Sequence, residues 1–285
     1  MPLNERMGAD CAINECFLML DERLIADIRE SGIAQGAVGI GDRARLLRNT
    51  GFRSGDRAEY ALIASCFLPS LVPESMKAFR LLLEHYQVDY TLLPKEYCCG
   101  NLLLRQAVKD KTGDEPGQAD ALAREFLEKN LIQAREVGAR KLLAFCVGCD
   151  LVHARFRDSV PEEMLWYPTL LARLFKGGKL ELEADYYAGC HYYYRRINGS
   201  LPDLDSAKEV LNHVEGLRLN LLDSSLCCTR PQQLESLLGN ARSRIVITPC
   251  GGCAMGLEQA LRARSDRRVV MLPEVVWAAV SGQSL

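Results

Sequence analysis

Ten of the twelve cysteines in this 285-residue chain fall into two sets of five. Each set has the same order: a single Cys, then an adjacent Cys-Cys pair, then a Cys-x-x-Cys. The first set comprises Cys66, Cys98, Cys99, Cys146 and Cys149, and the second comprises Cys190, Cys227, Cys228, Cys250 and Cys253. Gathered thiolates select soft or redox-active metals, and five exceed the four ligands of a tetrahedral zinc site. Iron and sulfide assembled into clusters fit such a set better.

The order of the other residues around these cysteines indicates an internal duplication. The Cys-x-x-Cys pairs lie 104 residues apart, and the prolines of two later, similar stretches, Pro168 and Pro273, lie 105 apart. Apolar runs that end on a Cys read as buried strands that deliver a ligand at their C-terminal edge. The matched pairs of segments are 62–66 with 186–190, 141–146 with 245–250, and 166–171 with 271–276.

Amphipathic helical patterns alternate with these strands. Residues 119–138 place apolar side chains on one face and end at a glycine, and residues 74–86 show the same periodicity. The alternation predicts an α/β fold of two pseudo-repeated cysteine-rich units, each a small, mostly parallel sheet flanked by helices. We expect an N-terminal extension over residues 1–56, a first repeat over 57–180 and a shortened second repeat over 181–285.

Composition excludes several other classes of protein. The chain is 48% hydrophobic and 25% charged, so it can bury ordinary cores without disulfide bonds. A formal net charge of −2 gives no broad basic footprint for nucleic acid or for an anionic membrane surface. No apolar run approaches a membrane span or an export signal, so we expect a cytoplasmic, reducing location in which the thiols are free to bind metal.

The spacing of the first set resembles a known family. Cys66, a spacer of 31 residues, Cys98-Cys99-Gly100 and then Cys146-Val147-Gly148-Cys149 are similar to the cysteine-rich CCG domain. Two such units in one chain resemble the B subunit of heterodisulfide reductase and its bacterial relatives, including those of complexes linked to sulfur oxidation. The resemblance covers about residues 57–285.

The resemblance implies that each five-Cys set binds a noncubane [4Fe-4S] cluster, so that all ten cysteines are cofactor-binding residues and iron ligands. It implies an oxidoreductase acting on sulfur groups, which makes or breaks a sulfur–sulfur bond in a disulfide or sulfane-sulfur substrate. Electrons would be exchanged with a ferredoxin-like iron–sulfur subunit and a flavin-containing subunit. Two alternatives stay open: a non-catalytic electron-relay subunit of another redox complex, and a zinc-stabilised interaction scaffold.

The chain departs from the family pattern in two places. The first repeat carries 46 residues between Cys99 and Cys146, and we expect the polar stretch 109–117 to form a surface loop. In the second repeat Thr229 follows the Cys-Cys pair in place of Gly, and only 21 residues separate Cys228 from Cys250. We therefore expect one helix fewer there, and a Cβ that crowds the backbone or changes the hydrogen bonding near the cluster.

A few further residues are candidates for a role at the site. His191 and Arg195 are the candidate catalytic residues: His191 to hydrogen-bond a cluster or substrate sulfur, and Arg195, beside Tyr192, Tyr193 and Tyr194, to hold a carboxylate or thiosulfonate-like anion. A histidine satisfied by the backbone and tyrosines that pack a core are the competing explanations. Cys11 and Cys16 stand outside the pattern, in an extension that docks a ferredoxin-like partner subunit, is disordered, or merely packs against the chain.

Overall fold

The computed structural model describes residues 22–33, 43–55, 57–109, 115–262 and 266–285. Their strands form two four-stranded parallel sheets with the same internal order, β2-β1-β3-β4 and β6-β5-β7-β8. The first sheet comprises β1 (Tyr60–Ile63), β2 (Tyr90–Leu92), β3 (Lys141–Ala144) and β4 (Glu163–Trp166). The second comprises β5 (Gly178–Tyr186), β6 (Val214–Leu221), β7 (Ile245–Thr248) and β8 (Arg268–Met271). The predicted α/β fold with two parallel sheets is confirmed.

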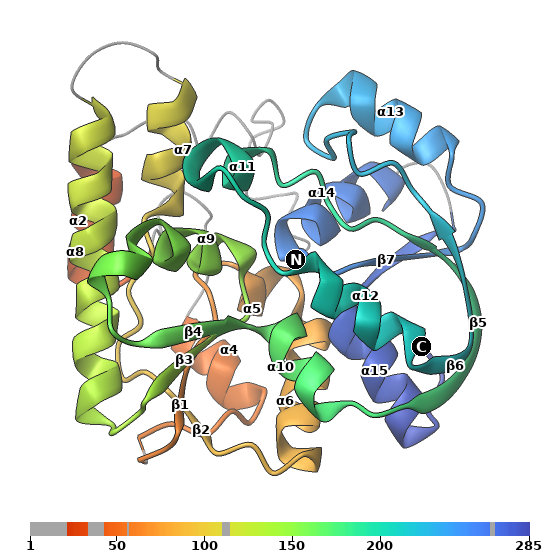
Figure 1. Ribbon diagram of the computed structural model, residues 1–285, viewed down its shortest axis with the longest axis horizontal. Helices are drawn as coiled ribbons and strands as arrows, with labels where there is room; N and C mark the ends of the chain where they lie inside the picture. Colours follow the sequence, from red (N-terminus) through yellow and green to blue (C-terminus); the bar gives the residue numbers. More distant parts are fainter. Residues whose placement is uncertain (1–21, 34–42, 56, 110–114, 263–265) are drawn as a thin grey trace.

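Helices flank both sheets, and the two halves lie side by side in Figure 1. Before and within the first half the helices are α2 (Glu22–Ser31), α4 (Arg43–Asn49), α5 (Leu68–Leu71), α6 (Pro73–His85), α7 (Asn101–Lys109), α8 (Glu115–Glu136), α9 (Val147–Phe156), the 3₁₀ turn η2 (Arg157–Ser159) and α10 (Tyr167–Leu174). Within the second half they are α11 (Tyr192–Asn198), α12 (Leu204–Asn212), α13 (Pro231–Gly239), α14 (Gly251–Arg262) and α15 (Leu272–Ser281).

The strands end earlier than the apolar runs of the sequence predict. Ser65 and Gly189, each directly before the first Cys of its set, have φ values of +88° and +99°. A left-handed residue turns the chain out of the extended conformation, so β1 stops at Ile63 and β5 at Tyr186. The cysteines therefore lie after the strands, on the following loops or in the first turn of the next helix, at the C-terminal edge of each sheet.

The connection between the Cys-Cys pair and the third strand differs between the repeats. In the first repeat, α7 and α8 both lie in this connection, and α8 begins at Glu115, so the predicted loop over 109–117 is too long at both ends. The first residues of α8 are polar, so no apolar periodicity marks the helix there and the sequence predicts a loop instead. Residues 229–244 of the second repeat are all described, and they contain α13 alone. The predicted loss of one helix is confirmed.

The last helix of each repeat also packs against a helix of the other repeat. α10, which ends the first repeat, packs on α12 of the second, and α15, which ends the second, packs on α6 of the first. Equivalent polar contacts join the helix starts: Thr169 Oγ1 donates to Asp203 Oδ2 at 2.7 Å, and Ser75 Oγ donates to Glu274 at 2.5 Å. One hydrophobic core consequently contains side chains from both sheets.

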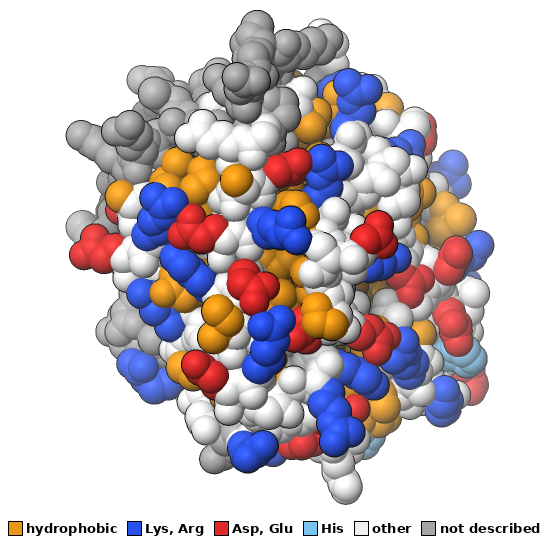
Figure 2. Space-filling model, turned by 60° about the vertical axis from the view of Figure 1, so that its left-hand side comes forward, with side chains coloured by type: hydrophobic (Ala, Val, Ile, Leu, Met, Phe, Trp, Pro, Cys, Tyr) orange, Lys and Arg blue, Asp and Glu red, His pale blue; other side chains and the backbone are white. Residues whose placement is uncertain are grey.

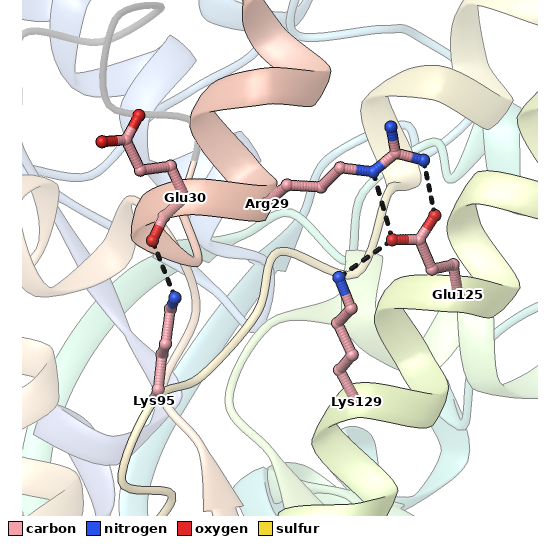
Figure 3. A network of polar contacts seen from close by, with 5 residues as sticks. All are labelled: Arg29, Glu30, Lys95, Glu125 and Lys129. Atoms are coloured by element: carbon pink, nitrogen blue, oxygen red, sulfur yellow. Dashed lines mark hydrogen bonds and ion pairs between the residues drawn. The ribbon is translucent and has the colours of Figure 1, made fainter.

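The described part of the N-terminal extension packs on the first repeat. Ile28 of α2 is buried there, and Arg29 binds the Glu125 carboxylate through two nitrogens, at 3.2 and 2.7 Å (Figure 3). Lys95 Nζ donates to the carbonyl of Glu30 at 2.7 Å. Partner docking by this extension stays a prediction. Cys11 and Cys16 lie outside the described residues.

Charges of both signs cover the described surface. In the face shown in Figure 2, Lys and Arg side chains alternate with Asp and Glu, with hydrophobic side chains exposed between them. This distribution agrees with the small net charge of the sequence. In the described ranges, no helix combines the length and the apolar character needed to cross a membrane.

Candidate metal centre

The ten cysteines occupy equivalent places in the two sheets. Cys66 and Cys190 follow β1 and β5, and the Cys-Cys pairs follow β2 and β6. Cys146 and Cys250 come directly before α9 and α14, whose first turns contain Cys149 and Cys253. Parallel strands end at one edge of a sheet, so each set of five is gathered there as the sequence predicts.

The thiols of the first set form one connected network. Cys66 contacts Cys98, Cys98 contacts Cys99, Cys99 contacts Cys149, and Cys149 contacts Cys146. The hydrogen bond to Cys98, together with burial, raises the pKa of Cys66 well above its usual range. The hydrogen bond from Cys149 lowers the pKa of Cys146 to about 7, with further donation from Gly148 N and the Ser65 side chain. A thiolate is therefore favoured at the start of α9, where the helix dipole also stabilises negative charge.

The thiols of the second set form a pair and a group of three. Cys190 contacts Cys227, while Cys253 contacts both Cys228 and Cys250. The hydrogen bond from Cys190 lowers the pKa of Cys227 to about 5, with further help from Thr229 and the charge of Arg230. The hydrogen bond from Cys253 lowers the pKa of Cys250. Each set thus holds thiols that lose a proton readily, as metal binding requires.

The two cysteine edges face each other across the interface between the repeats. A Cβ on Gly251, the residue after Cys250, would lie 2.4 Å from Leu68, which follows Cys66 closely. Tyr167 of the first repeat donates its hydroxyl hydrogen to the carbonyl of Pro249 at 2.7 Å. The charge of Cys146 also acts on Cys250, although the Cys253 hydrogen bond affects its pKa more. Both sets therefore border one shared region.

The glycine of Cys98-Cys99-Gly100 is required by packing against α8. Gly100 has a φ of +77°, and a Cβ there would lie 2.8 Å from Cα of Ala123 in α8. The second repeat has no counterpart of α8 within residues 229–244, and Thr229 does not have a positive φ. Its Oγ1 instead lies 3.1 Å from Sγ of Cys227. Of the two predicted effects of Thr229, the structure shows the change in hydrogen bonding rather than crowding.

The other predicted residues lie on or next to α11. His191 is buried with a φ of +46°, and its Nε2 hydrogen-bonds the carbonyl oxygen of Ala188 at 2.8 Å. This is the backbone-satisfied arrangement that competes with a role at sulfur. Arg195 is exposed, whereas Tyr194 is buried and donates to Asp150 Oδ2 at 2.7 Å. Whether His191 or Arg195 contacts substrate stays a prediction.

Sequence reasoning missed Glu96, which is buried beside the first set. Its carboxylate accepts hydrogen bonds from the backbone N–H groups of Ala64 and Ser65, at 2.7 and 2.9 Å. The duplication could not reveal this residue, because Ser225 stands at the matching place in the second repeat. An acidic residue two positions before a Cys-Cys pair was the only available signal.

The donor set fits an iron–sulfur group. Seven of the ten thiols are buried and three are half-buried, and each set offers five sulfur ligands, the donors that iron–sulfur clusters use. Glycine backbone approaches the second set closely, since a Cβ on Gly189 would lie 3.3 Å from Sγ of Cys253. In the part of the chain that the structure describes, no three Cys, His, Asp or Glu side chains are grouped to hold a single metal ion.

Comparison with known proteins agrees with this geometry. A family model described as a cysteine-rich domain, CCG, matches residues 60–152, which include all five cysteines of the first set. The chain is 25% identical over 224 residues to the D subunit of the dihydromethanophenazine:CoB–CoM heterodisulfide reductase of Methanosarcina mazei, covering 68% of this chain and 51% of that protein. The corresponding protein of Methanosarcina barkeri is 26% identical over 208 residues, covering 67% and 44%.

The chain spans about half the length of these curated relatives. The matched family segment runs from β1 into α9 and so contains the first sheet's strands up to β3. Residues 60–152 therefore match the CCG cysteine-rich domain, and the chain is similar at low identity to the heterodisulfide reductase D subunits.

Proposed function

We propose that the chain is an iron–sulfur subunit of a heterodisulfide-reductase-like complex, in which two noncubane [4Fe-4S] clusters act on a sulfur–sulfur bond. The observation that carries this proposal is the placement of two equivalent sets of five thiols at facing edges of two equivalent sheets. The likeness to heterodisulfide reductase subunits supports it. Its partners would be a ferredoxin-like iron–sulfur subunit and a flavin-containing subunit.

The electron count explains why two sites are useful. Reducing one sulfur–sulfur bond takes two electrons and two protons and gives two thiols, and the reverse reaction returns them. The clusters would supply or accept one electron each. Two facing sets of thiols allow both electrons to reach one bond, so neither sulfur has to leave as a radical. The electrons would come from, or go to, the partner subunits.

The protein's own residues prepare these sites for metal. The pKa is lowered to about 7 at Cys146, which precedes α9, and to about 5 at Cys227, and it is also lowered at Cys250, so thiolate forms more readily at these three positions. The surrounding thiols are buried, which keeps bulk water from the sulfur ligands. Arg195, exposed on α11, is the candidate for holding an anionic substrate group, and His191 is the candidate for contacting sulfur.

Iron and acid-labile sulfide, counted per chain on protein purified without oxygen, test the proposal. About eight irons with similar sulfide would support two four-iron clusters. Cys98→Ala should remove the first cluster and leave the spectrum of the second, whereas the control Cys16→Ala, outside both sets, should leave the iron content unchanged. Zinc without sulfide would overturn the proposal and favour a zinc-stabilised scaffold.

A non-catalytic electron relay is the second candidate. The shorter second repeat favours it, because a site built with one helix fewer differs in its surroundings from the first. Adding a thiol or a disulfide to the reduced and oxidised protein separates the two. A catalytic site should change its spectrum when sulfur binds, and a relay should keep the same spectrum.

A further inference from the structure

At three matching positions beside the cysteines, the two sites carry different polar or backbone groups. Glu96 stands two residues before the Cys-Cys pair of the first set, where the second set has Ser225. Ser65 precedes the first Cys, where the second set has Gly189. The third difference is Thr229 in place of Gly100. Because the surrounding fold is repeated, these substitutions place different polar groups next to equivalent sulfur atoms.

Glu96 ties together two loops of the first site. Its two carboxylate oxygens accept from the backbone N–H groups of Ala64 and Ser65, and the side chain is 4% exposed. Two such bonds hold the carboxylate against the loop that leads into Cys66. They also hold Ser65 at a φ of +88°, a conformation that glycine adopts in the second repeat. The negative charge of Glu96 acts on the neighbouring Cys66, beside larger effects of Cys98 and burial.

Near the half-buried Cys227, the second site has a hydroxyl group and a positive charge in place of a carboxylate. Thr229 Oγ1 lies 3.1 Å from Sγ of Cys227. Arg230, the next residue, lies over the ring of Tyr192 at 5.0 Å from its centroid, and its positive charge acts on Cys227. A hydroxyl hydrogen bond and a nearby cation both stabilise added negative charge on a sulfur ligand.

We propose that Glu96 and Thr229 give the two sites unequal reduction potentials, the first lower and the second higher. A carboxylate beside the first set disfavours an added electron there, and the hydroxyl beside Cys227 favours one in the second. An electron that leaves the first site therefore reduces the second, which is where it rests. This inference rests on the proposed function, since both sites must hold a redox group. Glu96 and Thr229 are positioning and tuning residues, with no required contact to substrate.

A redox titration followed by electron paramagnetic resonance tests this on the full chain, after iron and sulfide have been counted. The wild-type protein should show two midpoint potentials, and Cys98→Ala should remove the lower one. Glu96→Gln should raise the lower midpoint and leave the upper one in place. A tenfold shift in the distribution of one electron between the sites corresponds to about 59 mV.

Two further variants make the result specific. Thr229→Val removes the hydroxyl at similar volume and should lower the upper midpoint alone. Glu274→Gln is the matched control, because Glu274 is also largely buried and accepts from a backbone N–H, that of Met271 at 3.0 Å, but lies in the contact of α15 with α6. Neither midpoint should move in that control.

The outcomes separate this inference from the proposed function. A chain without iron and sulfide overturns the proposed function. Two clusters with equal midpoints, or midpoints that ignore both Glu96→Gln and Thr229→Val, overturn only the inference. A Glu274→Gln shift as large as that of Glu96→Gln also overturns it. If Glu96→Gln fails to retain the first cluster, the direction of the Thr229→Val shift decides alone.

Discussion

Replacing Gly100 with Ala should destabilise the first repeat strongly. At the φ of +77° found there, a residue with a Cβ loses roughly 1–2 kcal/mol relative to glycine. The new Cβ would also lie 2.8 Å from Cα of Ala123 and 3.0 Å from its Cβ, and such overpacking against a helix backbone costs about 1–3 kcal/mol. Alanine recovers about 0.4–1 kcal/mol by restricting the unfolded chain. We therefore expect a net loss of roughly 1–4.5 kcal/mol in the free energy of unfolding.

Urea unfolding of the full chain, with metal content matched between samples, measures this loss. Thr229→Gly is the comparison variant. It introduces a glycine at the position that matches Gly100, in the repeat whose residues 229–244 contain no counterpart of α8. It removes one hydrogen bond to Cys227 and adds chain entropy, so we expect a loss of about 1–2 kcal/mol. Equal losses for the two variants, or a Gly100→Ala protein within about 0.5 kcal/mol of wild type, would refute the packing argument.

Two further predictions concern contacts between elements that are distant in the sequence. Tyr167→Phe leaves the carbonyl of Pro249 without its buried donor and should cost about 1–3 kcal/mol in thermal or urea unfolding. The control is Tyr186→Phe, because the buried hydroxyl of Tyr186 has no hydrogen-bond partner among the described residues, and this variant should be neutral or slightly stabilising. The same loss of stability in both variants would contradict the role given to the Tyr167 hydroxyl. Arg29→Ala should loosen α2 only slightly, because the ion pair is partly exposed and screened. The hydrogen bonds from Arg29 and then Lys129 lower the pKa of Glu125 to about 2 from 4.5, so the contribution of the Arg29 contact is complete above pH 4.5 and disappears as the pH falls through about 2. Limited proteolysis near α2 should follow that profile in wild type and be flat in the variant.

The parallel sheets and the gathering of the cysteines could be predicted because both depend on local, repeated signals. Apolar runs that end near a Cys occur at matching intervals, and parallel strands place their C-terminal ends together whatever the details of the helices. The Gly138 stop was also visible, since α8 ends at Glu136 and Gly138 has a φ of +70°. The predicted bounds of the loop after α7 were wrong, because polar residues occur on solvent-exposed helix ends as well as in loops, so polar composition alone does not separate the two.

The differences between the sites could not be predicted from the duplication. Glu96 has no counterpart to align with, and its importance comes from backbone N–H groups on another loop, which no sequence pattern marks. The role of Gly100 likewise depends on where α8 passes, since only its contact with Ala123 makes a Cβ intolerable. Such features depend on three-dimensional neighbours, so a sequence can suggest that Thr229 matters without showing how.

Contacts between terminal helices and the other repeat hold the two sheets together. α10 packs on α12 of the second repeat, and α15 packs on α6 of the first as well as on its own sheet. Burial of apolar side chains in the shared core, rather than the linker between the repeats, therefore fixes the relative orientation of the two sheets. Because the cysteines lie at the C-terminal edges of those sheets, the same packing fixes the distance between the two sites. The proposed transfer of electrons between two clusters would need such a fixed distance, and the core shared by the two repeats would supply it.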